Sequence, residues 1–142
     1  MKLHEIRHID RPLQEVFAFT ADFSNSERWD PGVSSSKPIE ETEPGVGSRY
    51  ELMVRFGSRE IPMTYEITGW EQDSRVVLEG RGATITAVDD IRFEEKDGGT
   101  LVDYTADLRF TNWMRFITPL LAPALSRVGE KALDGLVETL EQ

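Results

Sequence analysis

The middle of the chain, from residue 49 to residue 110, alternates between apolar and polar residues with a period of two. Successive side chains of a β-strand point to opposite faces, so this period is typical of half-buried antiparallel strands. Four stretches show it, with apolar positions within residues 50–56, 61–67, 76–78 and 85–93. The alternation predicts a sheet with one apolar face, and another element must cover that face.

Asp97-Gly98 is a strong signal for a two-residue hairpin turn, because both residue types tolerate a positive φ. Such a turn sets the register of the two flanking strands, with the following pairs: Lys96 and Gly99, Phe93 and Val102, Ile91 and Tyr104, Asp89 and Ala106. The register places apolar residues opposite apolar residues. Residues 103, 105, 107 and 109 then lie on the solvated face.

Residues 2–9 alternate as a first strand, and two short helices are expected after it. Asp10 is expected to cap a helix with Pro12 in its first turn and an apolar face over residues 13–21. Ser24 and Glu27 have the spacing of a capping box, which predicts one or two further helical turns before the loop at residues 31–32.

The period returns to helical after residue 112, and the regular helix is expected from about Pro123 to Glu141 because Pro119 and Pro123 should break or kink its first part. Gly129 and Gly135 each cost about 1 kcal/mol relative to alanine in a helix interior. We therefore expect another part of the chain to approach the helix closely at these two positions. The element order predicts an α+β fold with six to seven antiparallel strands and a long C-terminal helix.

Size and charge exclude several classes of protein. The 142 residues fit one domain, and a net charge of -10 argues against nucleic acid as a partner. Cysteine is absent, which excludes disulfides and thiolate chemistry. The apolar run from residue 113 to 125 is too short to span a bilayer, and residues 1–10 lack the apolar segment of a secretory signal. We expect a cytoplasmic protein without stable membrane insertion.

Several stretches resemble a known family: PLQEVFAFTADFSNSERWDPGV, GVGSRYEL, YEITGWEQDSRVVLEG, DGGTLVDYTADL and ALDGLVETLE. Together they are similar to the polyketide cyclase/dehydrase and lipid-transport family of the START-like (SRPBCC) superfamily, which shares the helix-grip fold of the birch-pollen allergen. The resemblance covers nearly the whole chain. It implies one START-like ligand-binding domain over residues 1–142, with a curved sheet wrapped around the last helix and a cavity between them.

We expect a small hydrophobic or aromatic ligand, such as a lipid, a polyketide or an isoprenoid, and no cofactor. The oligomeric state is expected to be a monomer or a homodimer. The resemblance supplies no catalytic signature for numbered positions, so every candidate site residue comes from the sequence pattern.

Five candidate ligand-binding residues are aromatic or apolar: Trp29, Tyr50, Val54, Tyr65 and Tyr104. Trp29 either flanks the mouth of the cavity and stacks on a ligand, or closes one end of an ordinary core. The three tyrosines point to the apolar face of the sheet. Their phenols either find partners within the core or orient a ligand.

Asp89 is the candidate catalytic residue, because it is a carboxylate on the otherwise apolar face of residues 85–93. Burial there should raise its pKa, and it could then act as a general acid or base. A β-bulge near Val88 would instead turn the side chain out to water.

Trp113 and Phe116 are the last two candidate ligand-binding residues. They belong either to a lid hinged at the prolines or to the packing at the end of the sheet. His4 and His8 lie about 13 Å apart on one strand face, too far apart to share a metal ion. No metal site is expected.

Three functions remain open. The pattern favours binding or transport of a small hydrophobic molecule, because the predicted cavity face has many aromatic residues and a single acid. The second is a polyketide cyclase or dehydratase in which Asp89 and a tyrosine move protons. The third is a protein-interaction module with a filled cavity, for which an exposed apolar patch would be expected.

Overall fold

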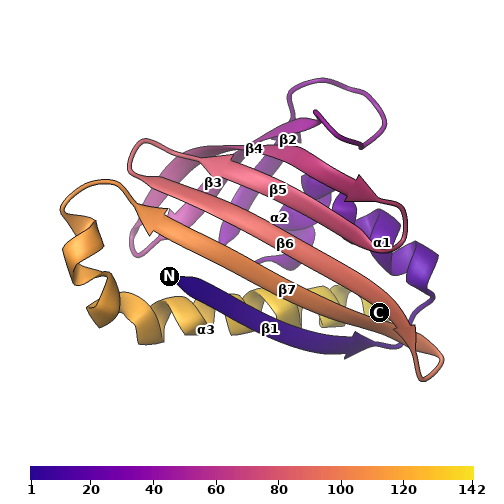
Figure 1. The fold of residues 1–142 in the computed structure, drawn as a ribbon. Helices are drawn as coiled ribbons and strands as arrows, with labels where there is room; N and C mark the ends of the chain where they lie inside the picture. Colours follow the sequence, from indigo (N-terminus) through magenta and orange to yellow (C-terminus); the bar gives the residue numbers. More distant parts are fainter.

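A computed structural model describes residues 1–142, and its main feature is one curved antiparallel sheet of seven strands (Figure 1). The spatial order is β1-β7-β6-β5-β4-β3-β2. The strands are β1 (Lys2–Ile9), β2 (Val33–Pro38), β3 (Arg49–Phe56), β4 (Arg59–Glu71), β5 (Arg75–Arg81), β6 (Ile85–Lys96) and β7 (Gly99–Phe110). The α+β class predicted from the element order is confirmed.

The β6–β7 hairpin has the register predicted from its turn. Asp97 and Gly98 have φ values of 51° and 76°, and the strands pair Lys96 with Gly99 and Asp89 with Ala106. The pairing continues without a shift to the far end of β6. No bulge turns Asp89 outward, and its side chain is buried on the concave face.

Two short helices and a 3₁₀ turn follow β1, as predicted, but their expected caps are wrong. They are α1 (Leu13–Ala21), the 3₁₀ turn (Phe23–Asn25) and α2 (Ser26–Trp29). The N-cap of α1 is Pro12, with no capping side chain. The Asp22 carboxylate instead accepts a hydrogen bond from the Ser24 N–H, and Glu27 accepts one from the Ser36 N–H. Glu27 therefore fixes β2 to α2 and closes no capping box.

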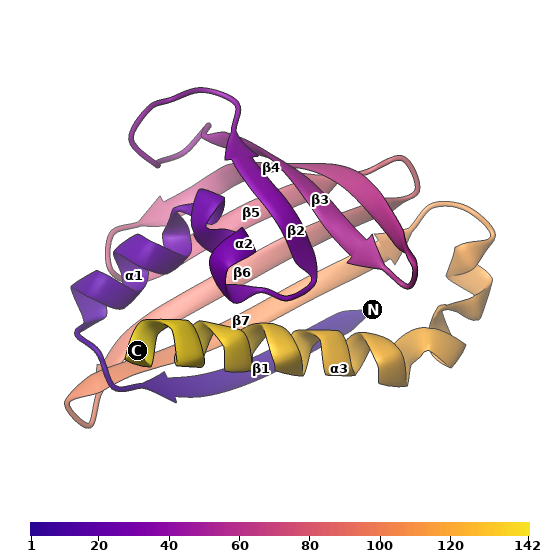
Figure 2. The same ribbon diagram turned by 180° about the vertical axis from the view of Figure 1, so that it is seen from behind.

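The long helix α3 (Met114–Glu141) begins nine residues earlier than predicted and contains both prolines. Its start is fixed by the Asn112 side chain, which accepts a hydrogen bond from the Met114 N–H at 3.0 Å. The prolines bend the helix and do not end it, since each removes only one backbone donor. Figure 2 shows the first turns of α3 standing at an angle to the rest. No helix is both long and apolar enough to cross a membrane.

The helix α3 lies along β1 and against α2, across the concave side of the sheet (Figure 2). A Cβ placed on Gly135 would lie 2.0 Å from the Trp29 carbonyl oxygen, so the close approach predicted there is confirmed. The prediction for Gly129 is wrong, because a Cβ there would meet nothing closer than 3.8 Å. The C-terminal half of α3 therefore packs in close contact with the backbone of α2.

The core fills the end of the molecule that holds α1, α2 and the C-terminus. The Phe17 ring packs edge-on against Trp70 and Phe93, with centroids 5.0 and 5.1 Å apart. Leu136 of α3 and Ile91 of β6 are completely buried in the same cluster.

Candidate functional site

A cavity of ≈ 160 Å³ lies between the concave face of the sheet and α3. Seventeen of its 22 lining residues are hydrophobic, so its walls favour apolar guests. The walls come from all strands but β5, from α3 and from the segment around α2, with these residues: Leu3, Glu5, Phe23, Asp30, Val33, Leu52, Val54, Arg55, Phe56, Met63, Tyr65, Ile85, Ala87, Asp89, Tyr104, Ala106, Leu108, Leu125, Val128, Gly129, Ala132 and Leu133.

Asp89 is the buried acid of this cavity. Its Oδ2 accepts a hydrogen bond from the Tyr104 hydroxyl, which reaches it from the neighbouring strand β7. Burial raises the pKa of Asp89 to about 7, while the Tyr104 bond lowers it and the charge of Asp30 raises it further. The carboxyl group therefore changes its protonation state near neutral pH.

Asp30 is a second acid in the wall, at the C-terminal end of α2. Burial raises its pKa to about 6, against the opposing effects of a hydrogen bond from the Gly32 N–H and the charge of Arg55. The Gly32 bond to Oδ1 is 2.8 Å long, and Arg55 is held nearby by a 2.6 Å hydrogen bond to the Pro31 carbonyl oxygen. A partly buried carboxyl group and a buried one thus line the same apolar space.

Tyr65 and Tyr104 also belong to the wall. Burial and the charge of Asp89 raise the pKa of each phenol well above its ordinary value, so both remain protonated donors. The Tyr65 ring lies directly on Gly80 of β5, where a Cβ would come within 2.5 Å of the ring. That contact fixes the Tyr65 ring.

The structure brings only some of the predicted site residues to the cavity. Asp89, Tyr104, Tyr65 and Val54 line it. Trp29 and Tyr50 are buried in the packed core around Phe23, at centroid distances of 6.4 and 6.3 Å, and do not belong to the lining. Trp113 and Phe116 are exposed at the start of α3.

Glu5, Asp30 and Arg55 are the charged lining residues that sequence reasoning did not single out. The Asp-Pro-Gly order predicts that an aspartate side chain caps the N–H two residues further on, and Asp30 does so at Gly32. That local signal identifies a turn. It does not predict that the Asp30 carboxyl group lies in the same cavity wall as Asp89, which is 59 residues away in the sequence.

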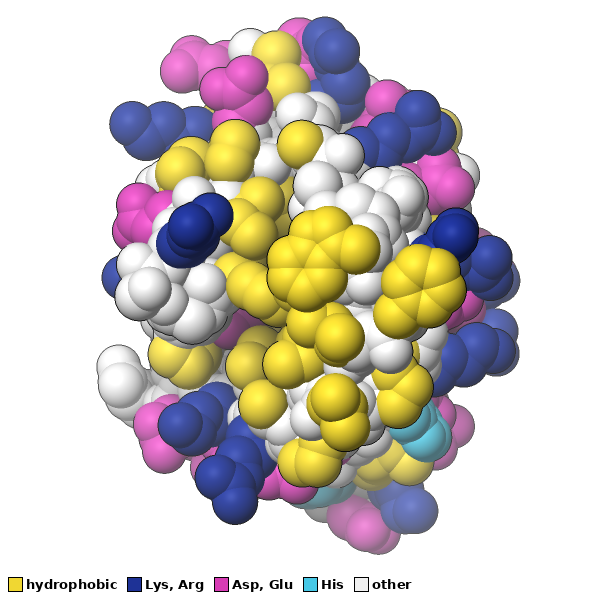
Figure 3. Space-filling view, turned by 90° about the vertical axis from the view of Figure 1, so that its left-hand side faces the viewer, with side chains coloured by type: hydrophobic (Ala, Val, Ile, Leu, Met, Phe, Trp, Pro, Cys, Tyr) yellow, Lys and Arg dark blue, Asp and Glu magenta, His cyan; other side chains and the backbone are white.

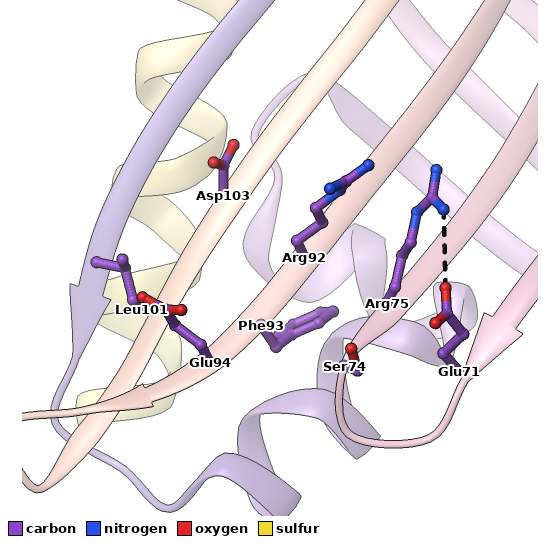
Figure 4. A pocket seen from close by; sticks show the side chains of 8 residues that line it. All are labelled: Glu71, Ser74, Arg75, Arg92, Phe93, Glu94, Leu101 and Asp103. Carbon is purple, nitrogen blue, oxygen red and sulfur yellow. Dashed lines mark ion pairs between the residues drawn. The ribbon is translucent and has the colours of Figure 1, made fainter.

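The outer face of the sheet has a shallow hollow of a different kind (Figure 4). Arg75 forms two hydrogen bonds to Asp90, of 3.0 and 2.8 Å, and a 3.7 Å ion pair with Glu71. The Arg75 bonds lower the pKa of Asp90, the neighbour of Asp89 on the opposite face. Most of the charged groups that line this hollow already form ion pairs, and the hollow lies open to solvent, so it is a weaker candidate for a ligand site than the cavity. No group of three or more His, Asp or Glu side chains in the protein is arranged to hold a metal ion.

A curved sheet closed around a long terminal helix, with an apolar hollow between them, defines the class of helix-grip proteins. Residues 1–141 match the model of the family described as polyketide cyclase / dehydrase and lipid transport. The chain belongs to that family, as the resemblance in its sequence indicated. No curated protein sequence matches it.

Solved structures show the same fold. TTHA0849 from Thermus thermophilus superposes with a TM-score of 0.79 at 17% identity, covering 99% of this chain and 94% of the other. Ara h 8.0201 gives 0.71 at 14% identity, covering 99% and 95%. DynU16, a protein in the dynemicin biosynthetic locus, gives 0.69 at 12% identity, covering 99% and 47%. These identities support a shared fold and no shared ligand.

Proposed function

We propose that the chain binds a small apolar or aromatic molecule in this cavity and holds one oxygen of it at Asp89 and Tyr104. The observation that supports this proposal is an apolar hollow whose wall carries one hydrogen-bonded carboxyl–phenol pair. Apolar walls contribute non-directional affinity for the ligand, and a few polar groups fix the orientation in which the ligand binds. A protonated Asp89 donates to a carbonyl oxygen, and an ionised one accepts from a hydroxyl group.

The size of the cavity limits the guest. A volume of ≈ 160 Å³ suits one aromatic ring, since an apolar cavity of about 150 Å³ is known to hold benzene. Pockets for larger ligands usually measure about 300–1,000 Å³. A lipid, a polyketide or an isoprenoid therefore requires the cavity to widen. Leu125 and Val128 are the first residues of α3 in the cavity wall, so outward movement of this part of the helix would widen the cavity.

Phenol and toluene test the proposal as a matched pair of single-ring guests. Titration followed by the backbone amide signals of the protein should place both ligands in the cavity, with phenol bound several-fold more tightly because one hydrogen bond contributes about 1 kcal/mol. The Tyr104→Phe variant should lose most of that preference. If neither ligand moves the signals of β6 and β7, the proposal is wrong.

A cavity-filling variant tests whether the two ligands bind in this cavity. Ala106 lies in the wall, and Ala106→Leu should abolish the binding of both ligands. Ala124 lies on the exposed side of α3, so Ala124→Leu makes the same chemical change without filling the cavity. Equal binding by the two variants would place the ligands elsewhere.

A second candidate function is ring closure of a polyketone. The supporting observation is the pKa of Asp89 near 7, which suits a group that must both take and return a proton. In an intramolecular aldol reaction, ionised Asp89 would take the proton next to one carbonyl, and the resulting carbanion would form the new C–C bond at a second carbonyl. The alkoxide formed there would take its proton from the Tyr104 hydroxyl, which the protonated Asp89 then restores.

This candidate is tested by the rate at which the protein converts a short linear diketone into its cyclic aldol. Loss of a general base usually lowers a rate by about 10²–10⁴-fold, so Asp89→Asn should abolish nearly all turnover. Phenol binding by a protein that leaves the diketone unchanged would support carriage alone.

A further inference from the structure

The first turns of α3 carry apolar side chains on two adjacent faces, about 100° apart around the helix axis. Met114, Ile117 and Leu121 are partly buried toward the protein. Trp113, Phe116 and Leu120 are 65%, 72% and 81% exposed. A surface helix usually presents a single apolar face to the core, so apolar side chains beyond that face indicate contact with a further partner such as lipid. Since only one of these two faces meets the protein, the other face lacks an apolar partner.

The charges around this segment differ from those of the whole chain. The net charge is -10, yet residues 108–129 contain three arginines (Arg109, Arg115 and Arg127) and no acidic residue. The hairpin tips at the same end add Arg59 and Arg81 (Figure 1). None of Arg59, Arg81, Arg115 and Arg127 takes part in an ion pair. These cations remain available to an external anion.

Figure 3 views this end directly and shows apolar side chains gathered at its centre, with charged side chains of both signs around them, among which Lys and Arg are prominent. We propose that this surface, made of Trp113, Phe116, Leu120 and the surrounding arginines, docks the protein onto an anionic membrane surface. The exposed side chains enter the region between headgroups and acyl chains, and the arginines bind lipid phosphates and carboxylates. The docking does not depend on an occupied cavity.

The chemistry of the surface favours a lipid surface over a second copy of the chain. A twofold contact would bring the same unpaired arginines of two copies together, and like charges repel. Tryptophan is enriched at membrane interfaces. The Arg115 guanidinium lies 4.7 Å from the centre of the Phe116 ring, so the charge can stay at the level of the headgroups while the ring lies deeper.

The docked orientation brings the cavity wall close to the lipid. Leu125 and Val128 line the cavity and lie on α3 about one to four turns after the docking residues. A membrane that pulls on the first turns of α3 acts on the part of the wall whose movement would widen the cavity. Membrane docking and ligand entry thus act on the same segment of α3.

The test is co-sedimentation of the full chain with vesicles of phosphatidylcholine alone and of equal parts phosphatidylcholine and phosphatidylserine. We expect binding to the mixed vesicles that weakens with salt, because each arginine near the surface contributes about fivefold in affinity. The double variant Phe116→Ser/Leu120→Ser should bind more than about tenfold more weakly. The double variant Arg115→Gln/Arg127→Gln should lose a similar factor on mixed vesicles only.

Val46→Ser is the matched control, since Val46 is 68% exposed in the β2–β3 loop, away from this surface, and should bind as the wild type does. Circular dichroism should show unchanged melting for all variants, because only exposed side chains change. Three results would overturn the proposal: wild-type protein that remains in the supernatant with mixed vesicles, variants that bind like wild type, or a wild-type dimer that Phe116→Ser/Leu120→Ser converts to monomer.

Discussion

The two halves of α3 differ in how they meet the rest of the protein. All but one of its buried residues lie in the C-terminal half: Ala132, Leu133, Leu136 and Leu140. Gly135 of that half contacts the backbone of Trp29. Between Met114 and Ala124 no residue is buried, and two prolines interrupt the hydrogen bonds of the helix.

The difference assigns separate roles to the two halves. Many buried contacts around the C-terminal half provide the stability of the fold. Few buried contacts make a segment easy to displace, and this is the property that a carrier needs where its ligand enters. Under the proposed function, the C-terminal half of α3 holds the sheet and the N-terminal half moves to open the cavity.

The largest effect is expected from Gly135→Ala. The added methyl group would lie 2.0 Å from the Trp29 carbonyl oxygen, and α2 or α3 must shift to relieve this clash. We expect a loss of at least about 3 kcal/mol in the free energy of unfolding, measured by urea denaturation.

Gly129→Ala is its matched control in the same helix. The new methyl group would meet Leu3 at 3.8 Å, which is ordinary contact, and alanine favours the helix. The expected result is a gain of about 0.5–1 kcal/mol. Equal effects of the two substitutions would contradict the close contact between Gly135 and the Trp29 carbonyl group.

Leucine truncation compares the two halves by burial. Leu136 is completely buried, and Leu136→Ala should cost about 3 kcal/mol through lost burial and the cavity left behind. Leu121 is only half-buried, so Leu121→Ala should cost less than about 1 kcal/mol. Thermal melting of both variants measures the difference, and similar losses would contradict the comparison.

The stability of the wild type should depend on pH through Asp89. Its folded-state pKa of about 7 lies above the ordinary value of 3.8, so the folded protein binds this proton more tightly than the unfolded chain. Stability should therefore fall as the pH rises from about 4 to about 7. The full shift corresponds to at most about 4 kcal/mol.

Asp89→Asn removes this ionisation and should be more stable than wild type by about 2 kcal/mol at about pH 8, with no advantage near about pH 4. A smaller slope remains from Asp30, whose pKa is about 6. Glu95→Gln on the exposed part of β6 is the control and should leave the profile unchanged. A wild-type pH profile in Asp89→Asn would contradict the burial of this carboxyl group.

The features predicted correctly from the sequence depend on local signals. Asp97-Gly98 sets the β6–β7 register by its own turn geometry, and that register places Asp89 on the concave face. The cost of glycine in a helix pointed to the close approach at Gly135.

The features that were not predicted depend on contacts between distant segments. The helix α3 starts before its prolines because Asn112 caps it and Met114, Ile117 and Leu121 meet the protein. Asp30 lines the cavity because folding places α2 on the concave side of the sheet, and no residue near Asp30 in the sequence encodes that placement.

The most direct test of the cavity proposal is a crystal structure of the protein soaked with phenol. The account predicts the ring between Ala106 and Leu125, with its hydroxyl group within hydrogen-bond distance of Asp89 or Tyr104. A cavity that stays empty while phenol occupies the surface around Trp113 would contradict it.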